Sequence, residues 1–344
     1  MFGKRAIIFI CAGIFCLNFS CGLCFAEGED ASAAKTAKFG YVDKTGKLVI
    51  PLQFHKALAF SQGLAPVRID KKNGYIDKTG KVVIPPQYDS TEPFSEGLAR
   101  VETDRKYGYI DKAGKVVIEL SFEAAREFSG GLSCVKSEGK YGFIDKTGKL
   151  VIPAQFDYAR TFYEGLAGIR SQGKWGFVDT AGSVVIAATF SKSGDFHDGL
   201  AWVADDSGKY GFVDKTGKLV VEAKYAAAGD FSEGLAAVQS GSKWGYADKT
   251  GAEAIKPQFD CAETFSGGLA PVMVGVNWGV IDTSGKLIVQ PKFSYVWKYS
   301  QDLARVEKDG KIGFIDKAGG QPVACIYTGG GDFSEDLAPV ENLP

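Results

Sequence analysis

The chain has very few of the residues on which much enzyme and metal chemistry depends. Its 344 residues include only 2 His and 2 Met. Histidine titrates near neutral pH and is the commonest metal ligand, so its scarcity nearly excludes His-based catalysis and a His-rich metal site. Neither sign of charge is in excess, because 40 Lys and Arg accompany 41 Asp and Glu. Without a basic surplus, the chain is a poor candidate for nucleic-acid binding.

Catalytic sequence patterns are also missing. The sequence contains no GxSxG, HExxH, phosphate-loop or dinucleotide-binding motif. Its one cluster of His and Asp does not have the spacing of a calcium loop; the cluster comprises Asp195, His197, Asp198, Asp205 and Asp206. We therefore expect no enzyme activity, no catalytic residues, no metal and no cofactor.

Long hydrophobic runs are absent except near the start of the chain. Lys4 and Arg5 precede an apolar run over residues 6–19, and the small residues Cys24 and Ala26 lie just before Glu27. This order of basic, apolar and small residues is typical of a secretory signal peptide. The run is shorter than the roughly 18 to 20 residues of a membrane span.

We therefore predict a signal peptide over residues 1–26 and a polar linker over residues 27–38. The mature protein is expected to be secreted, periplasmic or extracellular, without a transmembrane segment. The alternative is a lipoprotein signal, in which Cys21 carries a lipid and anchors the protein to the membrane.

The rest of the chain is a tandem repeat. Glycines that follow an aromatic or similar residue recur 34 residues apart, with a single spacing of 35, at Gly40, Gly74, Gly108, Gly142, Gly176, Gly211, Gly245, Gly279 and Gly313. The extra residue lies in the stretch 204–209, where a turn can absorb it. Nine copies therefore fill residues 39–344 and form one repeat domain.

Each copy is predicted to contain three strands. Two short β-branched and aromatic segments, residues 141–145 and 149–152 in one copy, flank an Asp-Lys-Thr-Gly turn suited to a β-hairpin. A third segment, Leu-Ala-x-Val, follows at residues 166–169. Helix is disfavoured because Gly, Pro and β-branched residues recur every few positions. The sequence thus predicts an all-β array of nine three-stranded meanders.

Two arrangements of the nine copies satisfy the need to bury their hydrophobic faces against neighbours. In a closed, propeller-like ring, the last strand, residues 337–340, completes the first sheet. However, 34 residues are few for a four-stranded blade, and nine blades exceed the usual four to eight. We therefore favour an open or superhelical, solenoid-like array and keep the closed ring as the alternative.

The repeated residues carry a family resemblance. The WG or YG dipeptide, the [VI]D-x-x-GK turn, VIPxxF and F-x-x-GLAxV resemble the WG repeat family of bacteria, also called KWG repeats. The resemblance implies a binding or scaffold module, and it supplies no catalytic residues. Four residues depart from the pattern: Asn73 and Ile312 replace the aromatic residue, and Asp302 and Asp336 replace the glycine before Leu.

Positions that vary at a fixed place in the repeat are the candidate binding residues, because constant positions mostly report the fold. One variable position, called row 1 below, comprises Leu58, Glu92, Arg126, Arg160, Gly194, Gly229, Glu263, Trp297 and Gly331. A second, row 2, is the x of Leu-Ala-x-Val and comprises Pro66, Arg100, Cys134, Gly168, Trp202, Ala237, Pro271, Arg305 and Pro339. We predict binding through Glu92, Arg126, Arg160, Glu263, Trp297, Arg100, Trp202 and Arg305, because Arg, Glu and Trp suit a protein or glycan surface.

The sequence therefore predicts an exported, monomeric, non-enzymatic scaffold that binds a protein or a cell-envelope polysaccharide through a broad surface. A lipid-anchored envelope protein is the first alternative. A hydrolase or lyase that uses Asp and Glu near the centre of a ring is the second, and it requires that the ring closes.

Overall fold

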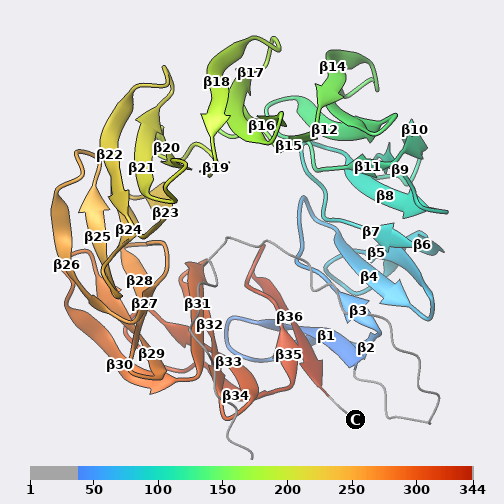
Figure 1. Cartoon of the computed structure of the whole chain (residues 1–344). Coiled ribbons are helices and arrows are strands. Elements are labelled where there is room, and N and C mark those ends of the chain that lie inside the picture. Colours follow the sequence, from blue (N-terminus) through green and yellow to red (C-terminus); the bar gives the residue numbers. More distant parts are fainter. Residues whose placement is uncertain (1–37, 343–344) are drawn as a thin grey trace, which may run out of the picture.

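The nine repeats form a closed ring of nine four-stranded β-sheets (Figure 1). The computed structural model describes residues 38–342, and among these it contains strands and turns but no helix. No segment in this range forms an apolar helix of membrane-spanning length. The predicted signal peptide and most of the predicted linker, including Cys21, lie outside the described residues.

The sheets are the blades of a propeller, and each is numbered here with its innermost strand first. Blades 1 to 3 comprise β35 (Gly329–Gly330), β36 (Leu337–Asn342), β1 (Lys38–Asp43) and β2 (Leu48–Phe54); β3 (Lys56–Ala57), β4 (Ala65–Ile69), β5 (Lys72–Ile76) and β6 (Val82–Tyr88); and β7 (Ser90–Thr91), β8 (Ala99–Thr103), β9 (Lys106–Ile110) and β10 (Val116–Phe122). Blades 4 to 6 comprise β11 (Ala124–Ala125), β12 (Leu132–Ser137), β13 (Lys140–Asp145) and β14 (Leu150–Phe156); β15 (Tyr158–Ala159), β16 (Leu166–Ser171), β17 (Lys174–Asp179) and β18 (Val184–Phe190); and β19 (Lys192–Ser193), β20 (Leu200–Ala204), β21 (Tyr210–Asp214) and β22 (Leu219–Tyr225). Blades 7 to 9 comprise β23 (Ala227–Ser232), β24 (Leu235–Ser240), β25 (Lys243–Asp248) and β26 (Glu253–Phe259); β27 (Cys261–Ala262), β28 (Leu269–Val274), β29 (Asn277–Asp282) and β30 (Leu287–Phe293); and β31 (Tyr295–Ser300), β32 (Leu303–Lys308), β33 (Lys311–Asp316) and β34 (Val323–Tyr327).

The prediction of an all-β array of nine repeats is confirmed, and the arrangement is the ring that was the alternative. The open array that we favoured is not observed. The predicted three strands per repeat are also too few, because each blade gains a short innermost strand, only two residues long in seven of the nine blades. A sequence repeat and a blade are not the same unit. Each repeat supplies the two outer strands of one blade and the two inner strands of the next.

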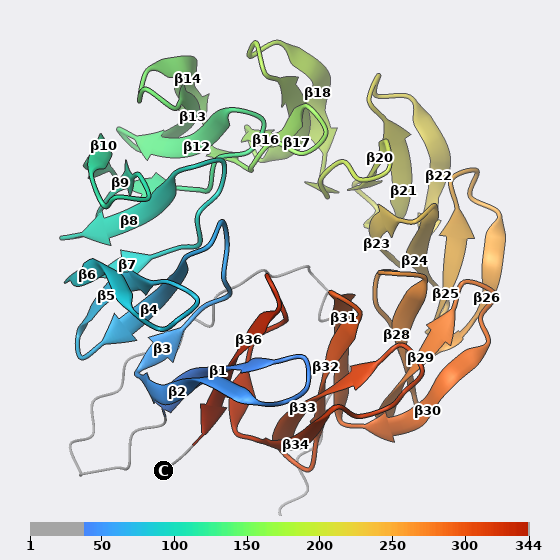
Figure 2. The same ribbon diagram turned by 180° about the vertical axis from the view of Figure 1, so that it is seen from behind.

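Blade 1 closes the ring by joining the two ends of the described chain (Figure 2). Strand β36 pairs antiparallel with β1, from Lys38 opposite Asn342 to Asp43 opposite Leu337. The Ser334 hydroxyl donates a hydrogen bond of 2.7 Å to the Phe60 carbonyl of blade 2. Equivalent Ser-to-carbonyl bonds join other neighbouring blades, as from Ser61 to Phe94. The closing junction is therefore built like the internal ones.

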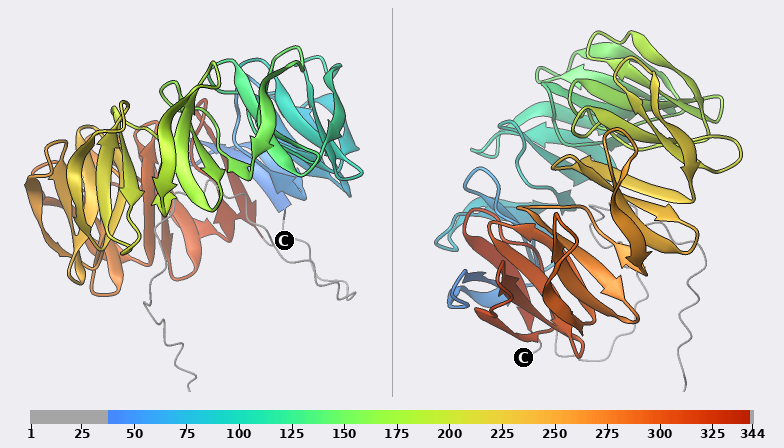
Figure 3. Two further views of the ribbon diagram at one scale, coloured as in Figure 1. Left: turned by 45° about the horizontal axis from the view of Figure 1, so that its top comes forward. Right: turned by 90° about the vertical axis from the view of Figure 1, so that its left-hand side faces the viewer.

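The hydrophobic core is divided among the junctions between blades. Nine buried clusters occur, one at each of the nine junctions, including the one between blades 9 and 1. The side views show the sheets standing next to one another around the ring (Figure 3). Pairs of aromatic rings recur in these clusters, such as Phe143 with Phe162 at 4.7 Å between centroids. Neighbouring copies thus supply the burial that a single repeat lacks.

The hairpin turns follow the predicted chemistry. Asp145 accepts hydrogen bonds from the Thr147 amide, the Thr147 hydroxyl and the Lys149 amide at 2.9, 2.6 and 3.1 Å. Gly148 adopts a φ of +85°, which favours glycine. The extra residue of the longer repeat forms a similar turn, in which Asp205 accepts from Ser207 and Lys209.

The glycine of the WG dipeptide is required by a close backbone approach. A Cβ atom on Gly176 would lie 2.4 Å from the Ile186 carbonyl oxygen of the neighbouring strand. The strand register shifts on both sides of this region, from Trp175 opposite Phe190 to Phe177 opposite Ile186. The constant glycine therefore marks the point where two strands of a blade come unusually close.

Candidate functional site

The two variable rows come together on the inner side of the ring. Each row 1 residue directly follows the first two residues of an innermost strand or lies within that strand, and row 2 lies on the second strand of the same blade (Figure 1). Backbone hydrogen bonds join the rows, for example from the Glu92 amide to the Arg100 carbonyl at 3.1 Å and from the Arg126 amide to the Cys134 carbonyl at 3.0 Å. We call the two rows together the inner band.

Glu92 and Arg100 form an ion pair within blade 3. Arg100 Nη2 lies 2.8 Å from Glu92 Oε1. Arg100 Nη1 donates a 2.9 Å hydrogen bond to the Ala125 carbonyl of blade 4, and its guanidinium lies 5.1 Å from the centroid of Tyr107. This arginine therefore also joins two blades, and its charge is already paired.

Arg160 and Arg305 are paired in a similar way with carboxylates of the following blade. Arg160 lies 3.5 Å from Asp195 and 4.3 Å from the Trp175 ring centroid. Arg305 lies 3.2 Å from Asp332 and 4.0 Å from the Trp297 ring centroid. These contacts combine ion pairing with cation–π attraction.

Asp195 is the carboxylate with the most unusual environment. Burial raises its pKa, Arg160 opposes this effect, and nearby Asp230 adds to it. His197 lies 3.9 Å from Asp230, and its ring stacks on Tyr163 with centroids 5.1 Å apart. This group lies next to the inner band in blades 5 to 7.

The His and Asp cluster noted in the sequence does not assemble around one point. Asp205 caps its hairpin turn, Asp206 pairs with Lys174, and Asp198 accepts a hydrogen bond from the Gly234 amide. Within residues 38–342, no three His, Cys, Asp or Glu side chains are placed to hold a metal ion.

Two predicted binding residues have structural contacts of their own. Trp202 is 7% exposed and belongs to the core at the junction of blades 6 and 7. It packs over Gly194, where a Cβ atom would lie 2.2 Å from its Nε1. Trp202 is therefore not available at the surface, contrary to its predicted place in a binding row. Glu263 remains partly exposed and accepts a 2.7 Å hydrogen bond from the Tyr295 hydroxyl.

Arg126 differs from the other three arginines of the inner band. Its guanidinium donates to the Tyr158 hydroxyl and lies 5.4 Å from the centroid of that ring. Within the described part of the chain, no carboxylate lies within 4.0 Å of it, whereas Arg100, Arg160 and Arg305 each have one.

Arg126 lines a pocket of about 320 Å³ at the junction of blades 3 and 4. The other lining residues are Glu92, Arg100, Ala124, Ala125, Glu127, Cys134 and Tyr141. Burial raises the pKa of the Cys134 thiol to about 12, so this group is neutral near pH 7. The structure therefore brings three predicted residues, Glu92, Arg100 and Arg126, to one pocket.

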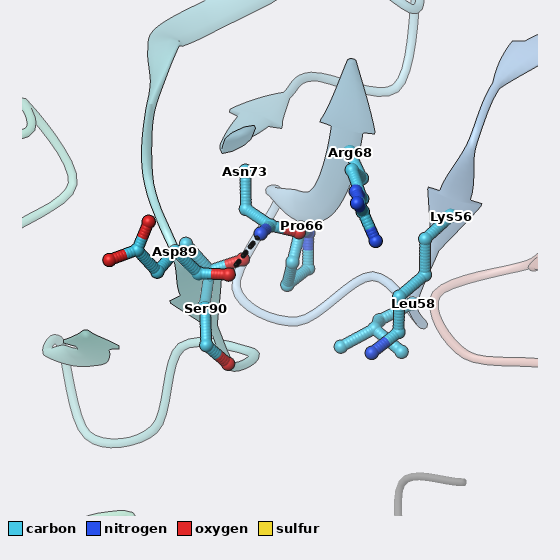
Figure 4. Close-up of a pocket in the computed structure, with 8 residues that line it drawn as sticks. Lys56, Leu58, Pro66, Arg68, Asn73, Asp89 and Ser90 are labelled. Carbon is cyan, nitrogen blue, oxygen red and sulfur yellow. Dashed lines mark hydrogen bonds between the residues drawn. The ribbon is translucent and has the colours of Figure 1, made fainter. Parts of the chain in front are cut away.

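A smaller pocket of about 80 Å³ lies at the junction of blades 2 and 3 (Figure 4). It borders Asn73, which replaces the aromatic residue before the repeat glycine. The Asn73 side chain donates a 2.7 Å hydrogen bond to the Asp89 carbonyl. This departure from the repeat pattern is thus accommodated locally, and the pocket is too small for more than a few atoms.

Sequence reasoning missed the partners of the inner band. Tyr158 and Tyr295 begin two innermost strands and stack on Tyr141 and Trp278, with centroids 5.1 and 4.7 Å apart. Asp195 and Asp332 directly follow row 1. The signal was present, because these residues also vary at fixed places in the repeat, but the innermost strands were not recognised as strands.

Comparison with known proteins supports the fold. The chain resembles a solved eukaryotic initiation factor with a TM-score of 0.61 and 11% identity, over 90% of this chain and 98% of that chain. It is also similar to BamB from Moraxella catarrhalis, with a TM-score of 0.48 and 13% identity over 83% and 96% of the two chains. At these identities the similarity shows the fold alone. No curated protein matches the chain.

A sequence profile described as WG containing repeat matches the chain nine times. The matched segments are residues 39–72, 74–107, 107–141, 141–175, 175–208, 210–244, 244–275, 278–311 and 312–342. They agree with the nine copies found from the glycine spacing, and together they cover nearly all of the described residues. The chain therefore belongs to the WG repeat family.

Proposed function

We propose that this protein is an exported, non-enzymatic scaffold that binds a protein or a cell-envelope polysaccharide through the inner band. The observation that carries this proposal is the division between constant and variable positions. Constant residues build the turns and the junctions between blades. Variable residues place partly exposed Arg, Glu and Trp side chains side by side on the inner band, and such side chains dominate many binding surfaces.

A pulldown from envelope extracts tests the proposal. The variant Arg126→Ala, Arg160→Ala, Trp297→Ala removes three partly exposed residues of the inner band. We expect it to lose the partner retained by the unchanged protein. A matched control replaces three exposed residues of turns, Arg105, Lys149 and Lys218, with Ala and keeps the partner. Equal retention by both variants contradicts a binding role for the inner band.

The route out of the cytoplasm is tested at the N-terminus of the mature protein. Export through a secretory signal peptide predicts a mature chain that begins at Glu27. The alternative, a lipid-anchored envelope protein, predicts an acylated Cys21. Mass spectrometry of the protein recovered from the envelope and the surrounding fluid distinguishes the two.

A carboxylate-based hydrolase or lyase is the second candidate function. The closed ring meets the condition that this function required, and burial raises the pKa of Asp195 near Asp230. A carboxylic acid with a raised pKa is the usual general acid of glycoside hydrolysis. Release of reducing ends or unsaturated products from polysaccharides, lost in Asp195→Asn, supports this candidate. Binding without product release favours the scaffold.

A further inference from the structure

We infer that the pocket at the junction of blades 3 and 4 binds a sugar unit that carries a carboxylate, as in a hexuronate-containing polysaccharide. This inference rests on the proposed function, since it names the ligand class of one part of the inner band. Three features support it: an unpaired arginine, a cavity with a structural cause, and a lining that matches both parts of such a ligand.

The unpaired arginine is explained by the neighbouring repeat. Arg160 pairs with Asp195, which directly follows row 1 in the next blade. The residue at that place next to Arg126 is Thr161, which is buried and has no charge. The partly buried guanidinium of Arg126 is thus left without an anion from the described chain, and Arg binds carboxylates through two parallel N–H donors.

The cavity exists because a small residue begins the innermost strand of blade 4. In blades 5 and 9 the equivalent residues, Tyr158 and Tyr295, stack on an aromatic residue of the preceding blade. Ala124 occupies this place in blade 4 and lines the pocket. The space that a tyrosine ring fills elsewhere is therefore open here.

The size and lining of the pocket match one sugar ring. A volume of about 320 Å³ is near the lower end of the range for small-molecule sites, about 300–1,000 Å³. Tyr141 supplies an aromatic wall. The carboxylates of Glu92 and Glu127 lie in the lining, where they can accept hydrogen bonds from hydroxyl groups.

The same carboxylates weigh against other anions. Glu92 is neutralised by Arg100, but Glu127 accepts only a neutral hydrogen bond of 3.0 Å from the Thr161 hydroxyl. A ligand that offers negative charge alone is repelled by Glu127. A hexuronate offers a carboxylate for Arg126 and hydroxyl groups for the acceptors.

Calorimetric titration of the purified protein tests the inference with three short probes. These are trigalacturonate, neutral maltotriose and triglutamate. We expect trigalacturonate to bind and the other two not to bind. Arg126→Gln is expected to weaken trigalacturonate binding by about tenfold or more, which is the loss of one charge-assisted interaction.

Two further variants separate loss of the pocket from loss of folding. Ala124→Tyr keeps Arg126 but fills the cavity with a residue found at this place in blades 5 and 9, so we expect loss of binding at an unchanged melting temperature. Arg105→Gln removes an exposed arginine in a turn of the neighbouring blade, and binding is expected to persist.

Several outcomes overturn the inference. Unchanged affinity in Arg126→Gln or Ala124→Tyr places the ligand elsewhere. Equal binding of maltotriose shows that the carboxylate is not recognised, and binding of triglutamate at this pocket assigns it to a peptide. If no probe binds but the envelope pulldown still depends on the inner band, this inference is wrong and the proposed scaffold function stands.

Discussion

Closure of the ring predicts that a residue near the end of the chain is as important for stability as its counterpart in the middle. Leu337 and Leu166 occupy the same place in their repeats, and each is 7% exposed. Leu337 packs in the cluster between blades 1 and 2, and Leu166 packs in the cluster between blades 5 and 6. Replacing a buried Leu with Ala costs about 3 to 5 kcal/mol, from the lost transfer free energy and the cavity left behind.

We therefore expect Leu337→Ala and Leu166→Ala to reduce the free energy of unfolding by similar amounts, within about 1 kcal/mol of each other. Urea unfolding followed by tryptophan fluorescence measures both. In an open array the strand that carries Leu337 has no partner from the start of the chain. A cost below about 1 kcal/mol for Leu337→Ala, with a full cost for Leu166→Ala, would refute ring closure.

Three further results are expected. Gly176→Ala places a Cβ atom 2.4 Å from the Ile186 carbonyl oxygen and should destabilise the protein by about 1 to 3 kcal/mol in urea unfolding, whereas Gly229→Ala, whose Cβ meets nothing closer than 3.8 Å, should be tolerated. Trp202→Ala should cost about 3 to 5 kcal/mol, more than Trp297→Ala, because only Trp202 is buried in the core; equal losses contradict this assignment. Hydrogen bonds from Thr147 lower the pKa of Asp145 in the folded state, and similar bonds lower the pKa of Asp77 and Asp214. This stabilisation is present above the unfolded pKa of about 4 and is lost as the pH falls through the folded values, so the urea midpoint should drop below pH 4, and less so in Asp145→Asn.

Strand content and turn chemistry were predictable because they recur nine times. Residues 141–145 and 150–156 alternate and flank a turn whose Asp and Gly have local roles, so nothing outside the repeat is needed to predict a hairpin there. The innermost strand could not be found in this way. Strand β11 has two residues, too few for any periodicity, and it pairs only because β12 lies beside it.

Closure was harder to predict because it depends on strands from opposite ends of the chain. The repeat length favoured a three-stranded unit, and that count made a blade of four strands look too long for 34 residues. The fourth strand comes from the preceding repeat, so every blade shares strands between two copies. The pairing of β36 with β1 is the same exchange carried out between the last copy and the first.

The inner band shows why predicted binding residues of one type do not have one role. Arg126 and Arg160 occupy the same place in successive repeats, and each directs its guanidinium toward an aromatic ring, Tyr158 or Trp175. What separates them lies in the following repeat, where Arg126 meets Thr161 and Arg160 meets Asp195. A ring of repeats therefore sets the charge of each pocket through pairs of residues about 35 positions apart. Reading such pairs along the sequence, once the blade boundaries are known, distinguishes an arginine that joins two blades from one that is free to bind a ligand.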